Sequence, residues 1–116
     1  MQYLALIYGD ESHWGSLSPE EREKQMGEYM ALSEAAVTRG GNELDSVATA
    51  TTVRVRNDET LVTDGPFVES KEVLGGYYVF ECNSIDEACN WAAKIPAARH
   101  GAIEVRPVHA EEGDVA

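Results

Sequence analysis

Basic residues are scarce in this sequence of 116 residues, which holds nine Lys and Arg against 21 Asp and Glu and has a formal net charge of −12. A surface that follows the phosphates of a nucleic acid needs clustered basic side chains, so we expect no direct nucleic-acid binding. The same deficit disfavours attachment to an anionic membrane. This charge balance fits good solubility or a basic partner.

Long apolar runs and closely spaced cysteines are also missing. The run at residues 3–8 is short and has neither a basic flank nor a cleavage site, so it is not a secretory signal. No stretch approaches the roughly 20 apolar residues of a membrane span. Cys82 and Cys89 do not form a C-x-x-C pair and are expected to be reduced. We therefore predict a cytoplasmic protein without membrane attachment.

Several motifs that carry known chemistry are absent. The sequence has no G-x-x-x-x-G-K-[ST] phosphate loop, no H-x-x-x-H or H-x-x-E-H metal motif, and no serine in a nucleophile elbow. No carboxylate cluster has metal-ligand spacing. We therefore predict neither a metal site nor a cofactor.

The length suits one domain, which we place at residues 1–108, with an acidic C-terminal tail at residues 109–116. Apolar or alternating runs predict strands at residues 2–8, 51–56, 60–63, 77–82 and 102–107. Asn57, Asp58 and Glu59 predict a hairpin turn between the second and third of these. The intervening residues 10–17 and 97–101 are predicted to be loops.

Two helices carry clear start signals. Ser18 is the expected N-cap of the first, with Glu21 completing a capping box, and Gly40-Gly41 is its predicted end. Ser84 and Glu87 repeat the device before the second helix, which Pro96 terminates.

This element order predicts an α+β fold of split β-α-β type, with an antiparallel sheet and two helices on one face. The second sheet face then carries either Tyr78 and Phe80 or Tyr77 and Val79. An apolar face of this kind is not expected to stay in water. We therefore predict a homodimer in which two sheets pack face to face about a two-fold axis.

Residues 64–72, 75–78, 95–99 and 104–108 carry a resemblance. With these runs the sequence resembles the YCII-related family, in its DGPF-motif branch. The resemblance implies a ferredoxin-like fold that pairs as a dimeric α+β barrel. It also implies a link to extracytoplasmic-function sigma factors, because some relatives of that branch show one. Related proteins have been proposed as enzymes that use a His–Asp pair, but His13, His100 and His109 lie in predicted loops and the tail.

The first candidate site is the loop that begins at Asp64. Its carboxylate, with Glu69, Lys71 and Glu72 nearby, could transfer protons or hold a polar ligand. The alternative is structural, since Asp64-Gly65-Pro66 is a strong turn signal and Phe67 would anchor it.

The second candidate site is a pair of guanidinium groups. Arg54 and Arg106 alternate with apolar strand residues, so they could point together into a dimer cavity, where Arg99 could join them, and hold a carboxylate or phosphate. The alternative is that they pair with the abundant glutamates.

Two functions are therefore predicted. The first is a ligand-binding or regulatory interaction module. The second is a cofactor-independent enzyme for proton transfer or a lyase reaction, with Asp64 or His13 as the base. A small anionic or aromatic ligand would contact a set of residues from both candidate sites and the aromatic strand: Arg54, Asp64, Gly65, Pro66, Phe67, Glu69, Lys71, Gly76, Tyr78 and Arg106.

Overall fold

The computed structural model describes residues 1–110, so most of the predicted tail at 109–116 lies outside the described residues. Its main sheet has the strand order β2-β5-β1-β6, and every neighbouring pair is antiparallel. The strands are β1 (Gln2–Gly9), β2 (Thr38–Glu43), β5 (Val73–Glu81) and β6 (Ala102–Pro107). A helix separates β1 from β2 and β5 from β6, which is the ferredoxin-like arrangement. The predicted α+β fold is confirmed.

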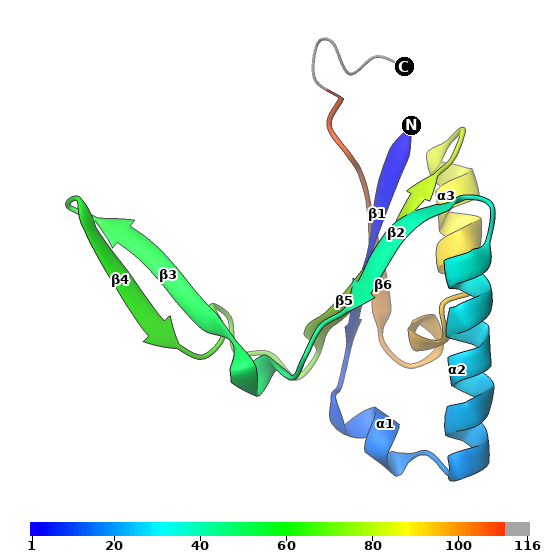
Figure 1. Cartoon of the computed structure of the whole chain (residues 1–116), viewed down its shortest axis with the longest axis horizontal. Coiled ribbons are helices and arrows are strands. Elements are labelled where there is room, and N and C mark those ends of the chain that lie inside the picture. The colour runs from blue at the N-terminus through cyan, green and yellow to red at the C-terminus, as the bar shows by residue number, and fades with distance from the viewer. Residues whose placement is uncertain (111–116) are drawn as a thin grey trace.

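Three helices and two 3-10 turns complete the main body: α1 (Ser12–Ser16), α2 (Pro19–Glu34), α3 (Ile85–Ala92), η1 (Val47–Thr49) and η2 (Pro96–Arg99). Both long helices cover the same face of the sheet (Figure 1). Within residues 1–110, no helix combines the length and the apolar character needed to cross a membrane.

Both predicted helix starts are confirmed. The Ser18 hydroxyl accepts a hydrogen bond from the Glu21 amide at 3.2 Å, and the Glu21 carboxylate accepts from the Ser18 amide at 3.0 Å. At α3 the Ser84 hydroxyl accepts from the Glu87 amide at 3.2 Å. The Glu87 carboxylate, however, accepts from the amide of Asn83 at 3.1 Å and not from that of the N-cap Ser84. The return hydrogen bond of this capping box is therefore shifted by one residue.

The core lies between the sheet and the two long helices. Tyr78 and Phe80 point into it from β5, with 7% and 0% of their surface exposed, and their rings stack with centroids 5.6 Å apart. Tyr77 and Val79 point to the other side, which we call the open face of the sheet. Burying a large apolar side chain contributes about 1.5 to 3 kcal/mol to folding, so Phe80 is a main anchor of the fold.

The first helix ends earlier than predicted. Helix α2 stops at Glu34, and Gly40-Gly41 lies inside the edge strand β2. A Cβ atom on Gly41 would lie 2.6 Å from the carbonyl oxygen of Tyr77 and 2.9 Å from Cδ1 of Tyr78. The glycine therefore permits close pairing with β5 and does not terminate the helix.

Two other predictions about loops were wrong. Residues 10–17 contain the short helix α1. Strand β5 begins at Val73, so Gly75 and Gly76 belong to the strand and not to the loop before it. A Cβ atom on Gly76 would lie 2.9 Å from the carbonyl oxygen of Asn42, so this glycine also permits a close backbone approach.

Strands β3 (Thr51–Arg56) and β4 (Glu59–Asp64) form a separate two-stranded sheet, which we call the arm. The predicted turn is confirmed: Asn57 and Asp58 have φ angles of 50° and 62°, as in a two-residue hairpin turn. The arm projects from the body on the side opposite the helices (Figure 1). The radius of gyration is 16.4 Å, against about 13 Å for a compact chain of this length.

Candidate functional site

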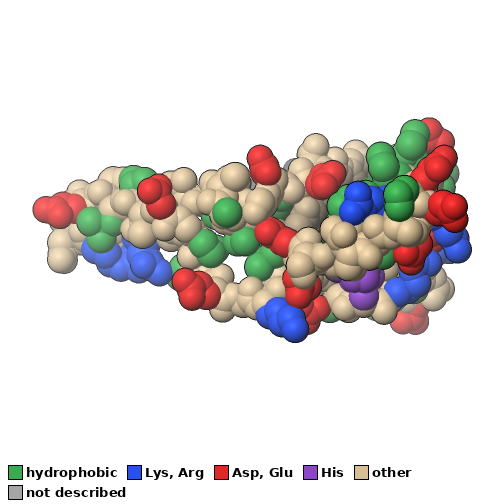
Figure 2. Space-filling model, turned by 90° about the horizontal axis from the view of Figure 1, so that it is seen from below, with side chains coloured by type: hydrophobic (Ala, Val, Ile, Leu, Met, Phe, Trp, Pro, Cys, Tyr) green, Lys and Arg blue, Asp and Glu red, His purple; other side chains and the backbone are tan. Residues whose placement is uncertain are grey.

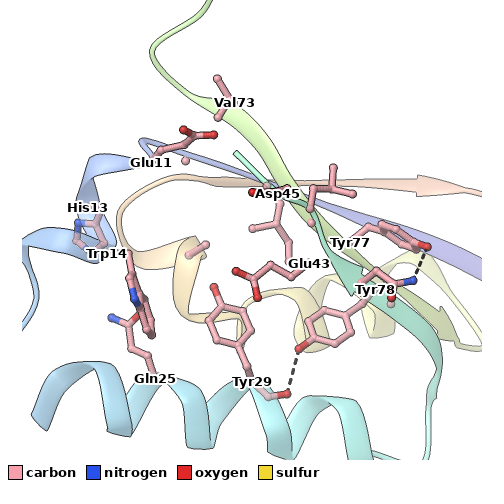
Figure 3. Close-up of a pocket in the computed structure, with 18 of the residues that line it drawn as sticks. Glu11, His13, Trp14, Gln25, Tyr29, Glu43, Asp45, Val73, Tyr77 and Tyr78 are labelled. Atoms are coloured by element: carbon pink, nitrogen blue, oxygen red, sulfur yellow. Dashed lines mark hydrogen bonds between the residues drawn. The ribbon is translucent and has the colours of Figure 1, made fainter. Parts of the chain in front are cut away.

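The main cleft has a volume of about 820 Å³ and lies between α1, α2 and the ends of β2 and β5. Aromatic rings and carboxylates dominate its lining (Figure 3). The aromatic residues along it are Trp14, Tyr29, Tyr77 and Tyr78, and the acidic ones are Asp10, Glu11, Glu43 and Asp45. Of these, Tyr77 borders the cleft from β5 but points its ring to the open face, where its hydroxyl accepts from the Asn42 side chain at 3.0 Å. Among the described residues that line it, none is Lys or Arg.

One wall of the cleft is built where α2 meets β5. The Tyr78 hydroxyl donates to the backbone carbonyl of Tyr29 at 3.0 Å and lies 3.5 Å from the hydroxyl oxygen of Ser33. The ring of Tyr29 rises from α2 into the cleft, and Glu43 reaches toward it from β2 (Figure 3). Burial raises the pKa of Tyr29, and the charge of Glu43 adds to the effect. Tyr29 therefore presents a protonated hydroxyl to the cleft at neutral pH.

The mouth of the cleft is formed by α1, which has no buried residue. The Glu11 carboxylate accepts from the Ser46 hydroxyl at 3.0 Å and from the Val47 amide at 2.6 Å, and this connects the start of α1 to η1. The Arg22 guanidinium donates to the carbonyl of Trp14 at 3.1 Å, connecting α1 to α2. Polar contacts thus hold both sides of this short helix.

Asp10 begins the α1 segment. Its carboxylate accepts from the Ser12 hydroxyl at 2.7 Å and from the Ser12 amide at 2.9 Å. These hydrogen bonds hold the pKa of Asp10 below its ordinary value. Asp10 is therefore ionised at neutral pH, and its oxygens stabilise the start of the helix.

Two histidines stack beside the cleft. His13 lies in α1, not in a loop as predicted, and its ring centroid is 3.5 Å from that of His100, with 22° between the planes. Partial burial lowers the pKa of His100, and the positive charges of His13 and Arg99 lower it further, against the opposing effect of Glu72. His100 is thus neutral at pH 7 and able to accept a proton.

The structure places only part of the predicted site in this cleft. Gly76, Tyr78 and His13 line it. Arg54 lies on the arm, where its guanidinium carbon is 5.2 Å from the ring centroid of Phe67. Arg106 lies on β6 opposite Leu4, on the open face. Within one chain, Arg54 and Arg106 are therefore on different sheets and are not brought together.

The loop that begins at Asp64 connects the arm to β5. Asp64 is exposed at the end of β4 and pairs with Thr51 across the hairpin. Gly65 has a φ angle of 106°, and its carbonyl accepts from the Thr52 hydroxyl at 2.8 Å. Pro66 follows Gly65, and Glu69 and Lys71 are exposed before β5. Among the described residues, the Thr52 hydroxyl and the Gly65 amide hold this bend, and the Asp64 carboxylate makes no hydrogen bond. Phe67 is 72% exposed, so it does not anchor the turn to the core as expected.

Sequence reasoning missed three residues that shape the cleft. Tyr29 and Trp14 belong to no motif that marks a functional site in the sequence. Both line the cleft, and Trp14 is 40% exposed. Glu43 was missed because β2 has no alternating apolar pattern that could have signalled a strand.

Two comparisons with known proteins bear on the chain. A family model described as the YCII-related domain matches residues 1–112. An uncharacterised protein of Rhizobium meliloti (strain 1021) is 40% identical over an alignment of 116 residues, which covers 93% of this chain and 92% of the relative. The similarity therefore extends over the body, the arm and the cleft together.

Proposed function

This chain belongs to the YCII-related domain family, and on that premise we propose that it is a small-molecule-binding module whose ligand occupies the main cleft. The cleft itself carries the proposal. Its volume of about 820 Å³ falls within the range of known small-molecule sites. Such sites combine apolar and aromatic walls with a few polar groups, as this lining does.

The lining supports a ligand with a positively charged group on an aromatic or apolar body. Asp10, Glu11, Glu43 and Asp45 would repel an anion, and the arginines expected to hold one lie elsewhere. Aromatic faces attract cations, with about 0.5 to 2 kcal/mol per contact. We therefore replace the anionic ligand of the sequence prediction with an amine and keep its aromatic character.

Calorimetric titration tests this proposal with two probes of similar shape and opposite charge, phenethylamine and phenylpropionate. We expect the amine alone to bind, and Glu43→Gln to weaken it about tenfold, which corresponds to about 1.4 kcal/mol. Tighter binding of the carboxylate would refute the amine class but keep the cleft as a binding site. The absence of binding by either probe, and by a wider set of amines, would refute the proposed function.

Pairing of two copies through the open face is part of the proposed function. Leu4, Leu6, Tyr77 and Val79 lie on this face and are half-buried within one chain, and both long helices cover the other face (Figure 1). The resemblance to the family's dimeric barrel supports the same pairing. Light scattering should give the mass of a dimer at micromolar concentration, and a monomer mass would refute it.

A regulatory setting follows from the resemblance of residues 64–72 to the DGPF branch. In this setting the module, with or without its amine, acts through a sigma factor and does not bind DNA itself. Purification of the tagged protein from its native host, followed by identification of any sigma factor that co-purifies, tests this step. Recovery of no sigma factor with the wild-type protein, in either ligand state, would remove it.

An enzyme is the second candidate function, and the histidine pair favours it. Neutral His100 could accept a proton at the edge of the cleft while the Tyr29 hydroxyl donates one. Asp64, the earlier candidate base, lies outside the cleft lining. Proton NMR in D2O should then show exchange of a carbon-bound hydrogen in a bound amine, and His100→Ala should abolish exchange while binding persists. Exchange that survives in this variant would exclude His100 as the base.

A further inference from the structure

The arm exposes apolar side chains on both of its faces. Val53 and Val55 are each 59% exposed, and Val62, which is paired with Val53, is 65% exposed. Leu61 on the opposite face is 44% exposed. A two-stranded hairpin that packs against nothing is marginally stable in water. The arm therefore needs a surface that the described part of the chain does not provide.

The arm and the open sheet face border the same space. The sheet separates the helices from the side on which the arm projects (Figure 1). Seen from below, hydrophobic side chains gather where the arm meets the body (Figure 2). Phe67 and Val68, in the segment that joins the arm to β5, are 72% and 59% exposed. A molecule seated against the open face would therefore also meet the arm.

A second copy of this chain, paired through the open face as proposed above, would be that molecule. With a net charge of −12, two copies repel each other unless a basic patch of one meets an acidic patch of the other. Arg54 and Arg56 lie on the same face of the arm, and within residues 1–110 neither forms an ion pair. Glu104 lies on the open face, opposite Leu6. In a two-fold pair, carboxylates of the other copy would be available to the arginines of each arm.

We infer that each arm extends across the second copy, with the face that carries the valines covering apolar surface there and the opposite face, which carries the arginines, meeting carboxylates. This inference rests on the pairing proposed above and adds a second contact to it. The contact is isologous, because both arms are covered by the same symmetry operation. It also places the Asp64-Gly65-Pro66-Phe67 turn at the subunit interface, away from the cleft of its own chain.

Removal of the arm is the first test. The amide of Gly65 donates to the carbonyl of Ala50 at 2.8 Å, so a Gly-Gly turn can replace residues 51–64 without moving the rest of the chain. Sedimentation equilibrium would compare the dissociation constants of the two proteins. We expect the dimer without the arm to dissociate at least 100-fold more readily. An unchanged constant would overturn the arm contact but leave the pairing through the open face, whereas a monomeric full-length chain would overturn both.

A second variant keeps the arm and guards against misfolding of the deletion. Val53→Lys with Val62→Lys adds two positive charges to the arm, and Glu20→Gln with Glu23→Gln makes the same charge change on α2. We expect only the arm variant to weaken the dimer, by tenfold or more.

Hydrogen exchange gives an independent measure: the arm amides should be protected in the wild-type dimer and lose protection on dilution. Equal effects of both variants, or arm amides that exchange freely in the dimer, would overturn the inference.

Discussion

Replacing glycine by alanine should have opposite effects at two positions, and this contrast tests the placement of β2. Gly27 lies within helix α2, where an added Cβ atom would have no neighbour within 4 Å. Gly41 lies in β2, where the same atom would be 2.6 Å from the carbonyl oxygen of Tyr77 and 2.9 Å from Cδ1 of Tyr78. The substitution adds one methyl group in each case, so only the surroundings differ.

The surroundings of each glycine set the expected change in the free energy of unfolding. Alanine is favoured over glycine inside a helix by about 1 kcal/mol, so Gly27→Ala should raise the free energy of unfolding by that amount. At Gly41 the nearest obstacle is a backbone atom, which cannot rotate away, and overpacking of this kind costs about 1 to 3 kcal/mol. The two variants should therefore differ by about 2 to 4 kcal/mol.

Urea denaturation followed by tryptophan fluorescence measures the difference. With a slope of about 2 kcal/mol per M, the two midpoints should lie about 1 to 2 M apart on either side of the wild type. All proteins are compared at one concentration, because the proposed dimer would add to the apparent stability. A midpoint for Gly41→Ala at or above that of the wild type would show that β2 does not pack closely against β5.

Three further predictions test the cleft and its supports. Tyr78→Phe removes a part-buried hydrogen bond and should lower the free energy of unfolding by about 1 kcal/mol. Tyr77→Phe removes a hydrogen bond that is exposed within one chain and should cost less than about 0.5 kcal/mol in the monomer. Thermal denaturation of dilute protein in which Tyr77→Phe is the worse variant would contradict the assignment of faces. The folded-state pKa of His100 lies below its unfolded value, so protonation of His100 favours unfolding, and the free energy of unfolding should fall as the pH drops below about 6.5. His100→Asn should flatten this pH profile, and an unchanged profile would show that the histidine pair does not control it. Ser18→Ala removes the cap of α2 and should cost about 1 kcal/mol in urea denaturation, and a neutral result would argue against the capping box.

The helices could be predicted because their signals are local. Ser18 and Glu21 satisfy the first amides of α2 within four residues of sequence, so no distant contact is needed to recognise the start. The hairpin turn at Asn57 and Asp58 is local in the same way, since both residues tolerate positive φ angles.

Strand β2 could not be predicted from local sequence because it forms by pairing with β5. The segment Thr38–Glu43 has no apolar alternation, and its conformation depends on pairing with β5, more than thirty residues later. The cleft depends on β2 in turn, since Glu43 reaches it from that strand. The stacking of His13 on His100 likewise joins segments at opposite ends of the chain, and no spacing rule links them.

Helix α1 has a consequence for how the molecule responds to its surroundings. Large apolar side chains such as Phe80 hold the main body together, whereas α1 buries no residue and is retained by hydrogen bonds and a histidine stack. Elements with so little buried surface open at a small fraction of the global unfolding free energy. Acidity and solutes that compete for hydrogen bonds should therefore release α1 while the sheet and the two long helices remain folded.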